Sequence, residues 1–184
     1  MLGRNPSTTG CFQAFFTSPL CSEPDSSEAS YDVAELEPLI RYPNTYALQE
    51  YFVPAETLEK FIPKMRKVFL AHDAQIINVS IRNAGVDPGS IMAWARSEVF
   101  SVVIYFKQGL GSKDRDQVGQ WTRALIDAAL DLGGTYYLPY QLHATEAQFA
   151  KAYPRAAELK NLKKQYDPGN RFRNKLIDGY LLSF

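Results

Sequence analysis

The chain has 184 residues, 46% hydrophobic and 13% aromatic, which is long and apolar enough for one packed domain rather than a disordered polymer. Lys and Arg together number 20, as do Asp and Glu, and this balance argues against a nucleic-acid-binding protein, which usually presents a basic face. No apolar run approaches the ~20 residues of a membrane span, and the N-terminus lacks the apolar core of a signal peptide. We therefore expect a cytoplasmic protein, with peripheral membrane association left open.

Residues 1–44 are rich in Ser, Thr, Pro and acidic residues and show no periodic pattern. This composition predicts an irregular tail or linker ahead of a domain spanning residues 45–184. Cys11 and Cys21 both lie in the tail, and without a secretory context we do not expect them to form a disulfide. The chain also has no His, Cys or carboxylate cluster with metal-ligand spacing, so we predict no metal site.

The hydrophobic pattern predicts a series of elements from residue 46 onward. In chain order these are a strand over 46–53, a helix over 58–69, strands over 75–82, 91–95 and 99–106, a long helix capped by Ser112, and a strand over 135–138. Pro63 should kink the first helix or shift its start, and Gly133-Gly134 should end the second.

Two shorter helices should follow. Thr145, with Gln148 three residues later, forms a capping-box pattern at the start of the first. In the second, Leu159, Leu162 and Tyr166 are expected to face inward before Asp167-Pro168 ends it. This order of elements predicts an α+β fold, an antiparallel sheet with both long helices packed on one face, in a ferredoxin-like arrangement.

The strand over 75–82 alternates clearly between apolar and polar side chains. One face carries Ile77, Val79 and Ile81, and the other carries Asn78, Ser80 and Arg82. Any half-exposed strand can show such a polar stripe. However, three different hydrogen-bonding groups side by side also suit a polyhydroxylated ligand.

Glu50 is unusual because it shares its face of the first strand with Leu48 and Phe52. A carboxylate among apolar side chains is costly unless it has a partner or faces a water-filled cleft. The alternative is an edge strand that leaves Glu50 in solvent.

Standard motifs are missing: Gly109-Leu110-Gly111 begins like a dinucleotide-binding loop, but Asp114 stands where its third glycine should be, which favours a simple turn and helix cap.

Tyr136 to His143 bring three tyrosines, an amide and an imidazole together between a helix end and a helix cap. Functional sites are often built on such loops. A lone His, however, is more often a structural hydrogen-bonding group than a catalyst. The loop is therefore a candidate site on sequence alone.

The segment from Gln49-Glu50-Tyr51-Phe52-Val53-Pro54 to the C-terminus resembles the C-terminal half of FAD-linked oxidases of the vanillyl-alcohol-oxidase superfamily. The most similar types are D-arabinono-1,4-lactone oxidase, alditol oxidase and decaprenylphosphoryl-ribose oxidase. The most specific part is the series Ala152-Tyr153-Pro154, Asp167-Pro168 and Arg171-Phe172-Arg173-Asn174.

The resemblance implies a cap, or substrate, domain that lays its sheet over the isoalloxazine ring of FAD. The substrate would be a small carbohydrate-like alcohol or lactone, and its hydride would pass to flavin N5. Residues 1–44 do not resemble the FAD-binding domain, so the resemblance implies an FAD-binding partner in cis or in trans. The alternative is a stand-alone α+β ligand-binding or oligomerisation module without redox activity.

The resemblance also assigns site residues. It implies that Glu50 and Arg82 face the substrate and that Tyr137 contacts the flavin. With Asn78 and Ser80 of the polar stripe, Glu50 and Arg82 are the candidate substrate-binding residues, and Tyr137, Tyr140 and Asn174 are the candidate cofactor-binding residues. Ser80 stands where alditol oxidases carry a carboxylate, and Tyr140 stands where relatives carry a lysine beside the flavin. Because the phenol of Tyr140 cannot replace that positive charge, Arg82 and His143 join it as candidate catalytic residues, with His143 as a base near neutral pH.

Overall fold

The computed structural model describes residues 44–181, all within one compact unit of the chain, residues 42–184. The predictions for the tail, including those for Cys11 and Cys21, lie outside the described residues. In the part that the structure describes, no helix combines the length and the apolar character needed to cross a bilayer.

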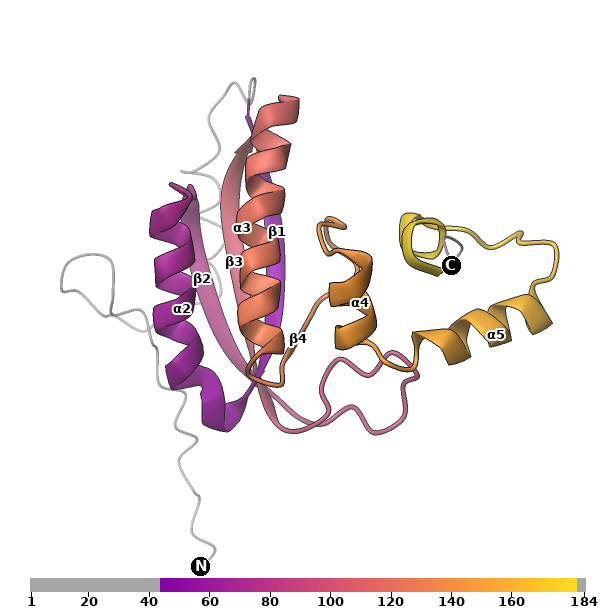
Figure 1. The fold of residues 1–184 in the computed structure, drawn as a ribbon. Coiled ribbons are helices and arrows are strands. Elements are labelled where there is room, and N and C mark those ends of the chain that lie inside the picture. The colour runs from indigo at the N-terminus through magenta and orange to yellow at the C-terminus, as the bar shows by residue number, and fades with distance from the viewer. Residues whose placement is uncertain (1–43, 182–184) are drawn as a thin grey trace, which may run out of the picture. The chain divides into compact units, whose positions relative to one another are not determined.

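The fold is α+β, as predicted, and is built on one four-stranded antiparallel sheet with strand order β2-β3-β1-β4 (Figure 1). Its elements are β1 (Asn44–Pro54), the 3-10 turn η1 (Ala55–Thr57), α2 (Leu58–Ala71), β2 (Ile76–Ala84), β3 (Val99–Gly109), α3 (Ser112–Leu130), β4 (Thr135–Tyr136), α4 (Glu146–Ala152), α5 (Ala156–Tyr166) and the short π-helix η2 (Ile177–Leu181). The β-α-β-β-α-β connectivity with this strand order is the ferredoxin-like arrangement.

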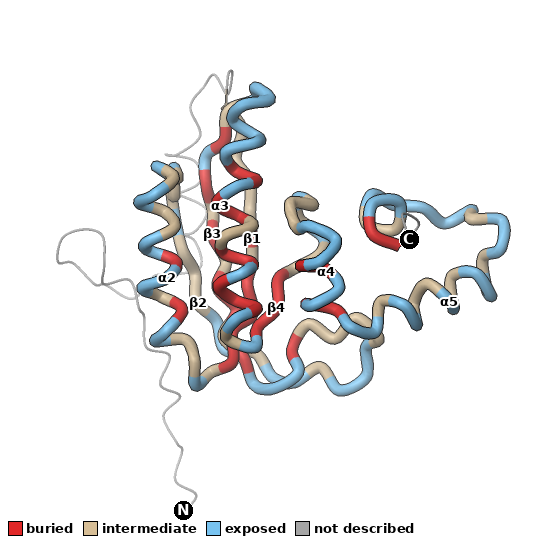
Figure 2. The backbone as a smooth tube through the Cα atoms, viewed as in Figure 1, coloured by how far each residue is buried: buried red, intermediate tan, exposed pale blue. Residues whose placement is uncertain are grey.

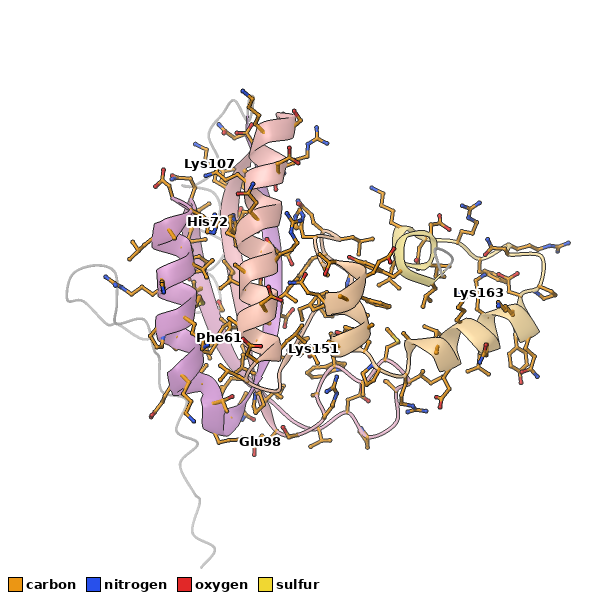
Figure 3. The ribbon with its side chains drawn as sticks, viewed as in Figure 1. Phe61, His72, Glu98, Lys107, Lys151 and Lys163 are labelled. Atoms are coloured by element: carbon orange, nitrogen blue, oxygen red, sulfur yellow. The ribbon has the colours of Figure 1, made fainter. Side chains whose placement is uncertain are left out.

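Both long helices, α2 and α3, cover the same face of the sheet (Figure 1). The core between them is formed by alternate residues of the central strands and one stripe of each helix: Tyr51, Val53, Val102, Ile104, Phe106, Phe61, Met65, Trp121 and Leu125. The ring of Phe61, labelled on α2 in Figure 3, has its centroid 6.1 Å from that of Tyr51. Burial of each large side chain stabilises the fold by roughly 1.5–3 kcal/mol, and Figure 2 shows the buried residues concentrated in this layer.

A β-bulge changes the predicted phase of β2. Ile76 pairs with Phe106 and Asn78 pairs with Tyr105, so Ile77 is an extra residue between two consecutive pairs. Consequently Ile76, and not Ile77, packs with Val79 and Ile81 against the core. The predicted place of Ile77 in that row is therefore wrong, because alternation along one strand cannot show an inserted residue.

The predicted strand over 91–95 is also wrong. These residues form turns between β2 and β3. Their apolar side chains are explained by packing rather than strand pairing: Ala95 is fully buried, and the ring of Trp94 lies 4.6 Å from that of Phe52. The segment therefore covers part of the sheet face that α2 and α3 leave open.

Gly133 and Gly134 end α3 as predicted, since the helix stops at Leu130 and Gly133 adopts a φ of +80°. Gly134 meets a tighter constraint, because a Cβ at this position would lie 2.3 Å from the backbone oxygen of Phe52. The close approach of the helix end to β1 therefore requires glycine.

At the other end of α3, Gly111 and not Ser112 is the N-cap, and the Asp114 carboxylate accepts the Gly111 N–H at 3.0 Å. The prediction of Ser112 as the N-cap is thus wrong by one residue. The oxygen that caps the helix belongs to the carboxylate of Asp114, in the first turn, and not to the serine side chain. The predicted capping box of α4 is confirmed: Thr145 and Gln148 each accept the other's backbone N–H, at 3.2 and 3.0 Å.

Helix α5 differs from the prediction in its burial. Leu159 packs against the core as expected, but no residue of α5 is fully buried. Tyr166 is 77% exposed, so its predicted inward orientation is wrong. Helix α5 packs on the core near its N-terminal end. Tyr166, at its C-terminal end, has no core surface to pack against within the described residues.

Candidate functional site

The sheet face opposite α2 and α3, here called the open face, carries most of the predicted site residues. Residues directly opposite each other in an antiparallel ladder point to the same side. Three cross-strand rows on the open face follow from the register: Arg82–Ser101–Phe52, Ser80–Val103–Glu50 and Asn78–Tyr105–Leu48. The structure thus brings the predicted polar residues of β1 and β2 onto one surface.

Glu50 has a specific partner on the open face. The Oγ of Ser101 donates a hydrogen bond to Glu50 Oε1 at 2.5 Å, and Ser101 is only 5% exposed. Because β1 pairs with both β3 and β4, the alternative of an edge strand for Glu50 is wrong. The half-buried carboxylate keeps its second oxygen for other donors. Sequence reasoning missed Ser101, although a single serine inside the mostly apolar run of residues 99–106 is a signal that could have found it.

Tyr137 and Tyr140 border the same cluster. The N–H of Tyr137 donates to the backbone oxygen of Glu50 at 2.9 Å, which continues the pairing of β1 with β4 by one residue. The ring of Tyr140 lies edge-on to that of Tyr137, with centroids 5.0 Å apart. Burial raises the pKa of Tyr140, the negative charge of Glu50 raises it further, and the charge of Arg82 opposes them. Tyr140 is therefore a neutral hydrogen-bond donor at pH 7, close to both charges.

Arg82 is exposed and forms no ion pair with any residue in the range 44–181. It lies directly opposite Ser101, one cross-strand row from Glu50. The guanidinium is a cation, so this part of the open face combines a positive charge with the carboxylate of Glu50.

Aromatic side chains lie on both sides of this polar centre. At one end the rings of Tyr46 and Tyr105 stack with centroids 5.7 Å apart. At the other end Phe52 packs against Trp94 and meets Tyr137 edge-on. A few convergent polar groups between apolar walls are typical of small-molecule sites, and flat aromatic surfaces suit a planar ring or a sugar face.

The structure places His143 elsewhere. Its ring lies against Gly119 of α3, and its Nε2 is 2.8 Å from Gln141 Oε1. Burial, and secondarily the charge of Arg123, lower the pKa of His143, and the Arg123 guanidinium also donates to the His143 carbonyl at 3.2 Å. His143 is thus a neutral imidazole beside α3 and is not in contact with the Glu50, Ser101 and Tyr140 cluster.

Asn174 is likewise separate from the open face. Its Oδ1 accepts the N–H of Ile177 at 2.8 Å and so caps the final short helix, η2. The side chain is exposed in the C-terminal segment. The structure therefore gives Asn174 a local structural role, and its predicted contact with a cofactor stays a prediction.

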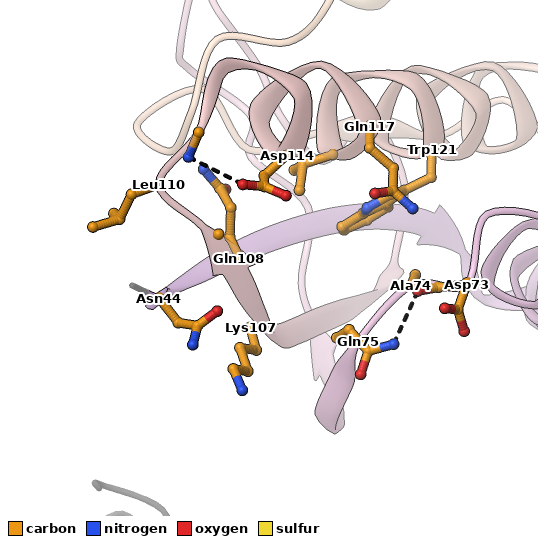
Figure 4. Close-up of a pocket in the computed structure, with 13 residues that line it drawn as sticks. Asn44, Asp73, Ala74, Gln75, Lys107, Gln108, Leu110, Asp114, Gln117 and Trp121 are labelled. Carbon is orange, nitrogen blue, oxygen red and sulfur yellow. Dashed lines mark hydrogen bonds between the residues drawn. The ribbon is translucent and has the colours of Figure 1, made fainter. Parts of the chain in front are cut away.

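A separate cavity of about 620 Å³ lies between the end of α2 and the start of α3 (Figure 4). None of the predicted site residues lines it. In its lining Asp114 accepts from Gly111, and Gln117 donates to the His72 carbonyl at 2.7 Å, whereas Gln108 Oε1 is buried without a hydrogen-bond partner. Since the predicted site residues lie elsewhere, we regard the open face as the better candidate site.

Comparison of the chain with protein-family models finds no match, and comparison with curated proteins finds none either. In residues 44–181, no group of three or more His, Cys, Asp or Glu side chains is positioned to hold a metal ion. The geometry of the open face and the sequence resemblance described above are therefore the features that point to a function.

Proposed function

We propose that the chain is the cap, or substrate, domain of an FAD-dependent oxidoreductase that oxidises a sugar-like alcohol or lactone. The observation that supports this most is the convergence of Glu50, Ser101, Arg82 and Tyr140 on the open face, from three strands and one loop. These groups match hydroxyl-bearing ligands, because carboxylate, guanidinium and phenol together accept and donate hydrogen bonds.

The open face also fits an isoalloxazine ring. It offers the aromatic surface of Tyr137 and Phe52 beside the charge of Arg82, and within residues 44–181 no helix covers it (Figure 1). FAD would supply the hydride-accepting atom, flavin N5. A flavin-binding partner in cis or in trans would hold most of the cofactor, with Tyr137 and Tyr140 as contacts from this chain.

In this proposal each polar side chain has a distinct task. Ser101 orients Glu50 so that its free oxygen accepts a substrate hydroxyl. Tyr140 donates a hydrogen bond to a substrate oxygen, and Asn78 and Ser80 bind further hydroxyls along β2. Arg82 would supply the charge that stabilises negative charge on the ring or on the substrate. In the oxidases that this sequence resembles, a lysine at the position of Tyr140 has this task.

The test is to co-express this chain with the polypeptide encoded immediately upstream. We expect a yellow complex whose visible flavin absorbance is bleached anaerobically by aldonolactones or alditols. Arg82→Ala should slow bleaching at least tenfold, about 1.4 kcal/mol of barrier. Arg66→Ala is the matched control, because Arg66 is an exposed arginine on α2 and lies outside the open face.

Two results would contradict the proposal. One is a colourless preparation in which the two polypeptides do not associate. The other is bleaching at the wild-type rate in Arg82→Ala and in Glu50→Gln alike. A sugar-like ligand that binds the isolated chain without any flavin partner would instead favour the stand-alone binding module.

A further inference from the structure

The cavity between the end of α2 and the start of α3 has a buried polar side chain in its wall (Figure 4). Along β3, Val102, Ile104 and Phe106 face the two long helices and are buried in the core. Gln108 is the next residue of this row, and it lines the cavity together with Trp121 of α3. An apolar row that ends in a glutamine marks the place where the core meets the cavity.

Gln108 has an unused hydrogen-bond acceptor. Its side chain is only 5% exposed, and its Oε1 is buried without a partner among the residues that the structure describes. Leaving such an acceptor unpaired costs about 1–3 kcal/mol. The last torsion of a glutamine side chain has a broad energy minimum, so rotation of the amide can turn Oε1 toward the cavity. A ligand there that donates a hydrogen bond would remove this cost.

Two further amides of the lining also leave an oxygen free. Gln75 Nε2 donates to the backbone oxygen of Asp73 at 3.1 Å, and Gln117 Nε2 donates to that of His72 at 2.7 Å. Because a carbonyl oxygen can only accept, it fixes the nitrogen of each amide on its own side. The oxygens of Gln75 and Gln117 therefore remain as acceptors for another donor.

Two glycines of the lining leave room for the carboxylate of Asp114. A Cβ would lie 2.3 Å from Asp114 Oδ2 at Gly109 and 2.8 Å from it at Gly111. The same oxygen accepts the Gly111 N–H at 3.0 Å. The start of a helix often binds an anion. Here a carboxylate of the chain itself takes that place, and its charge would repel a second anion.

The charged groups of the lining make the cavity acidic. Figure 4 shows the carboxylates of Asp73 and Asp114 on different sides of it. Lys107 is the basic residue of the lining, but it lies directly opposite Tyr46 in the ladder and belongs to the open face. In Figure 4 its ammonium group points away from both carboxylates. A ligand in the cavity therefore meets two negative charges and several acceptor oxygens.

We propose that this cavity binds a small organic cation that carries a primary ammonium group, with Gln108, Asp73 and Asp114 as its acceptors. An ammonium group has three N–H donors and no acceptor, so it complements this lining. A metal ion fits less well, because no group of three or more His, Cys, Asp or Glu side chains in residues 44–181 could hold one. The proposal goes beyond the proposed function and does not depend on it.

The experiment is an NMR titration of the purified, isotope-labelled chain with 1,4-diaminobutane. We expect saturable shifts of the side-chain amide signals of Gln108 and Gln117, and weaker binding as salt screens the charges. The control ligand is 1,4-butanediol, which has the same carbon chain and two hydroxyl donors but no charge. It should cause much smaller shifts.

Two substitutions test the acceptors. Gln108→Leu should raise the dissociation constant about tenfold or more, because it removes a hydrogen bond to a charged group, and it should not destabilise the fold, because it also removes an unpaired buried oxygen. Asp73→Asn should raise it about two- to fivefold, the effect of an exposed ion pair. Asparagine also tolerates the φ of +47° at this position. The matched control is Asp116→Asn, at an exposed carboxylate of α3 outside the lining, and it should leave the constant nearly unchanged.

Three results would overturn the proposal. Equal binding of 1,4-butanediol would show that hydroxyl groups, and not charge, are recognised. Equal effects of Asp73→Asn and Asp116→Asn, with no effect of Gln108→Leu, would show only a general attraction of cations to an acidic surface. Shifts of the same amides with sodium phosphate and none with the diamine would assign the cavity to anions. Each of these results leaves the proposed function standing, because none of the residues assigned to substrate or flavin lines the cavity.

Discussion

Ser101 and Glu50 lie 51 residues apart in the sequence, yet they form one of the closest side-chain contacts on the open face. Ser101→Ala removes the donor and leaves a half-buried carboxylate oxygen without its partner. Hydrogen bonds to charged groups contribute about 1.5–3 kcal/mol, and partial exposure of Glu50 brings the expected loss to about 1 kcal/mol. Urea denaturation of the isolated chain measures it. Ser97→Ala, at an exposed site, should change the free energy of unfolding by less than about 0.5 kcal/mol, and an equal effect of both substitutions would contradict the prediction.

His143 can be tested in the reassembled enzyme. If the imidazole takes part in the reaction, His143→Ala should slow flavin reduction by substrate at least tenfold, about 1.4 kcal/mol, and Tyr140→Phe should cost less. If the imidazole is a base, only its neutral form works, so the wild-type rate should fall as pH drops through its lowered pKa, and the variant should lose that dependence.

If His143 instead only positions the loop through Gln141 and Arg123, the variant should keep the pH profile and lose rate uniformly. Stopped-flow measurement of flavin bleaching across pH distinguishes the two roles. Reduction at the wild-type rate would mean that the imidazole has no part in catalysis.

At the scale of the elements, the junction of α3 with β1 is the most constrained backbone contact. Gly134→Ala would place a methyl group 2.3 Å from the Phe52 oxygen, which is a backbone atom of β1 and cannot rotate away as a side chain could. We expect a loss of roughly 3 kcal/mol in the free energy of unfolding, measured by urea denaturation. Gly85→Ala is the control, since a Cβ there has no neighbour within 4 Å. Similar stability of the two variants would show that the junction can relax.

The loop after α5 should respond to acid in a defined direction. The hydrogen bond from Lys163, with those from the backbone N–H groups of Arg171 and Phe172, lowers the pKa of Asp167 to about 2. A carboxyl whose pKa is lower in the folded than in the unfolded state stabilises the fold above its unfolded pKa, about 3.9, and loses this effect as pH falls through 2.

Hydrogen exchange at the amides of Arg171 and Phe172 should therefore stay slow at pH 4 and accelerate, relative to the intrinsic rate, toward pH 2. Asp167→Ala should remove the protection already at pH 7. Amides that exchange equally slowly in this variant would show that the loop is held by other contacts.

For the molecule as a whole, we expect the isolated chain to hold no flavin. The open face offers contacts to one side of a planar ring, and the sequence contains no recognisable phosphate-binding loop for the rest of FAD. Visible absorbance of the purified chain, together with flavin released on denaturation, measures the content. Stoichiometric FAD in the isolated chain would refute the division of labour between cap and partner.

The sequence by itself determined the fold class, both long helices, the glycine stop after α3 and the capping box at Thr145. These features depend on side chains within a turn or two of each other, so their signal is complete in a short window of sequence. The same reasoning placed Asn78, Ser80 and Arg82 on the face opposite the helices, because the bulge lies before Asn78 and leaves the alternation after it intact.

Only the tertiary structure decided which distant residues meet. It paired Ser101 with Glu50, inserted Ile77 as a bulge, turned residues 91–95 into a covering loop and left Tyr166 exposed. It also set His143 against α3 while Tyr140, three residues earlier, faces the charges of Glu50 and Arg82. Each of these outcomes depends on strand register or on packing between elements, and neither is encoded in the periodicity of any single segment.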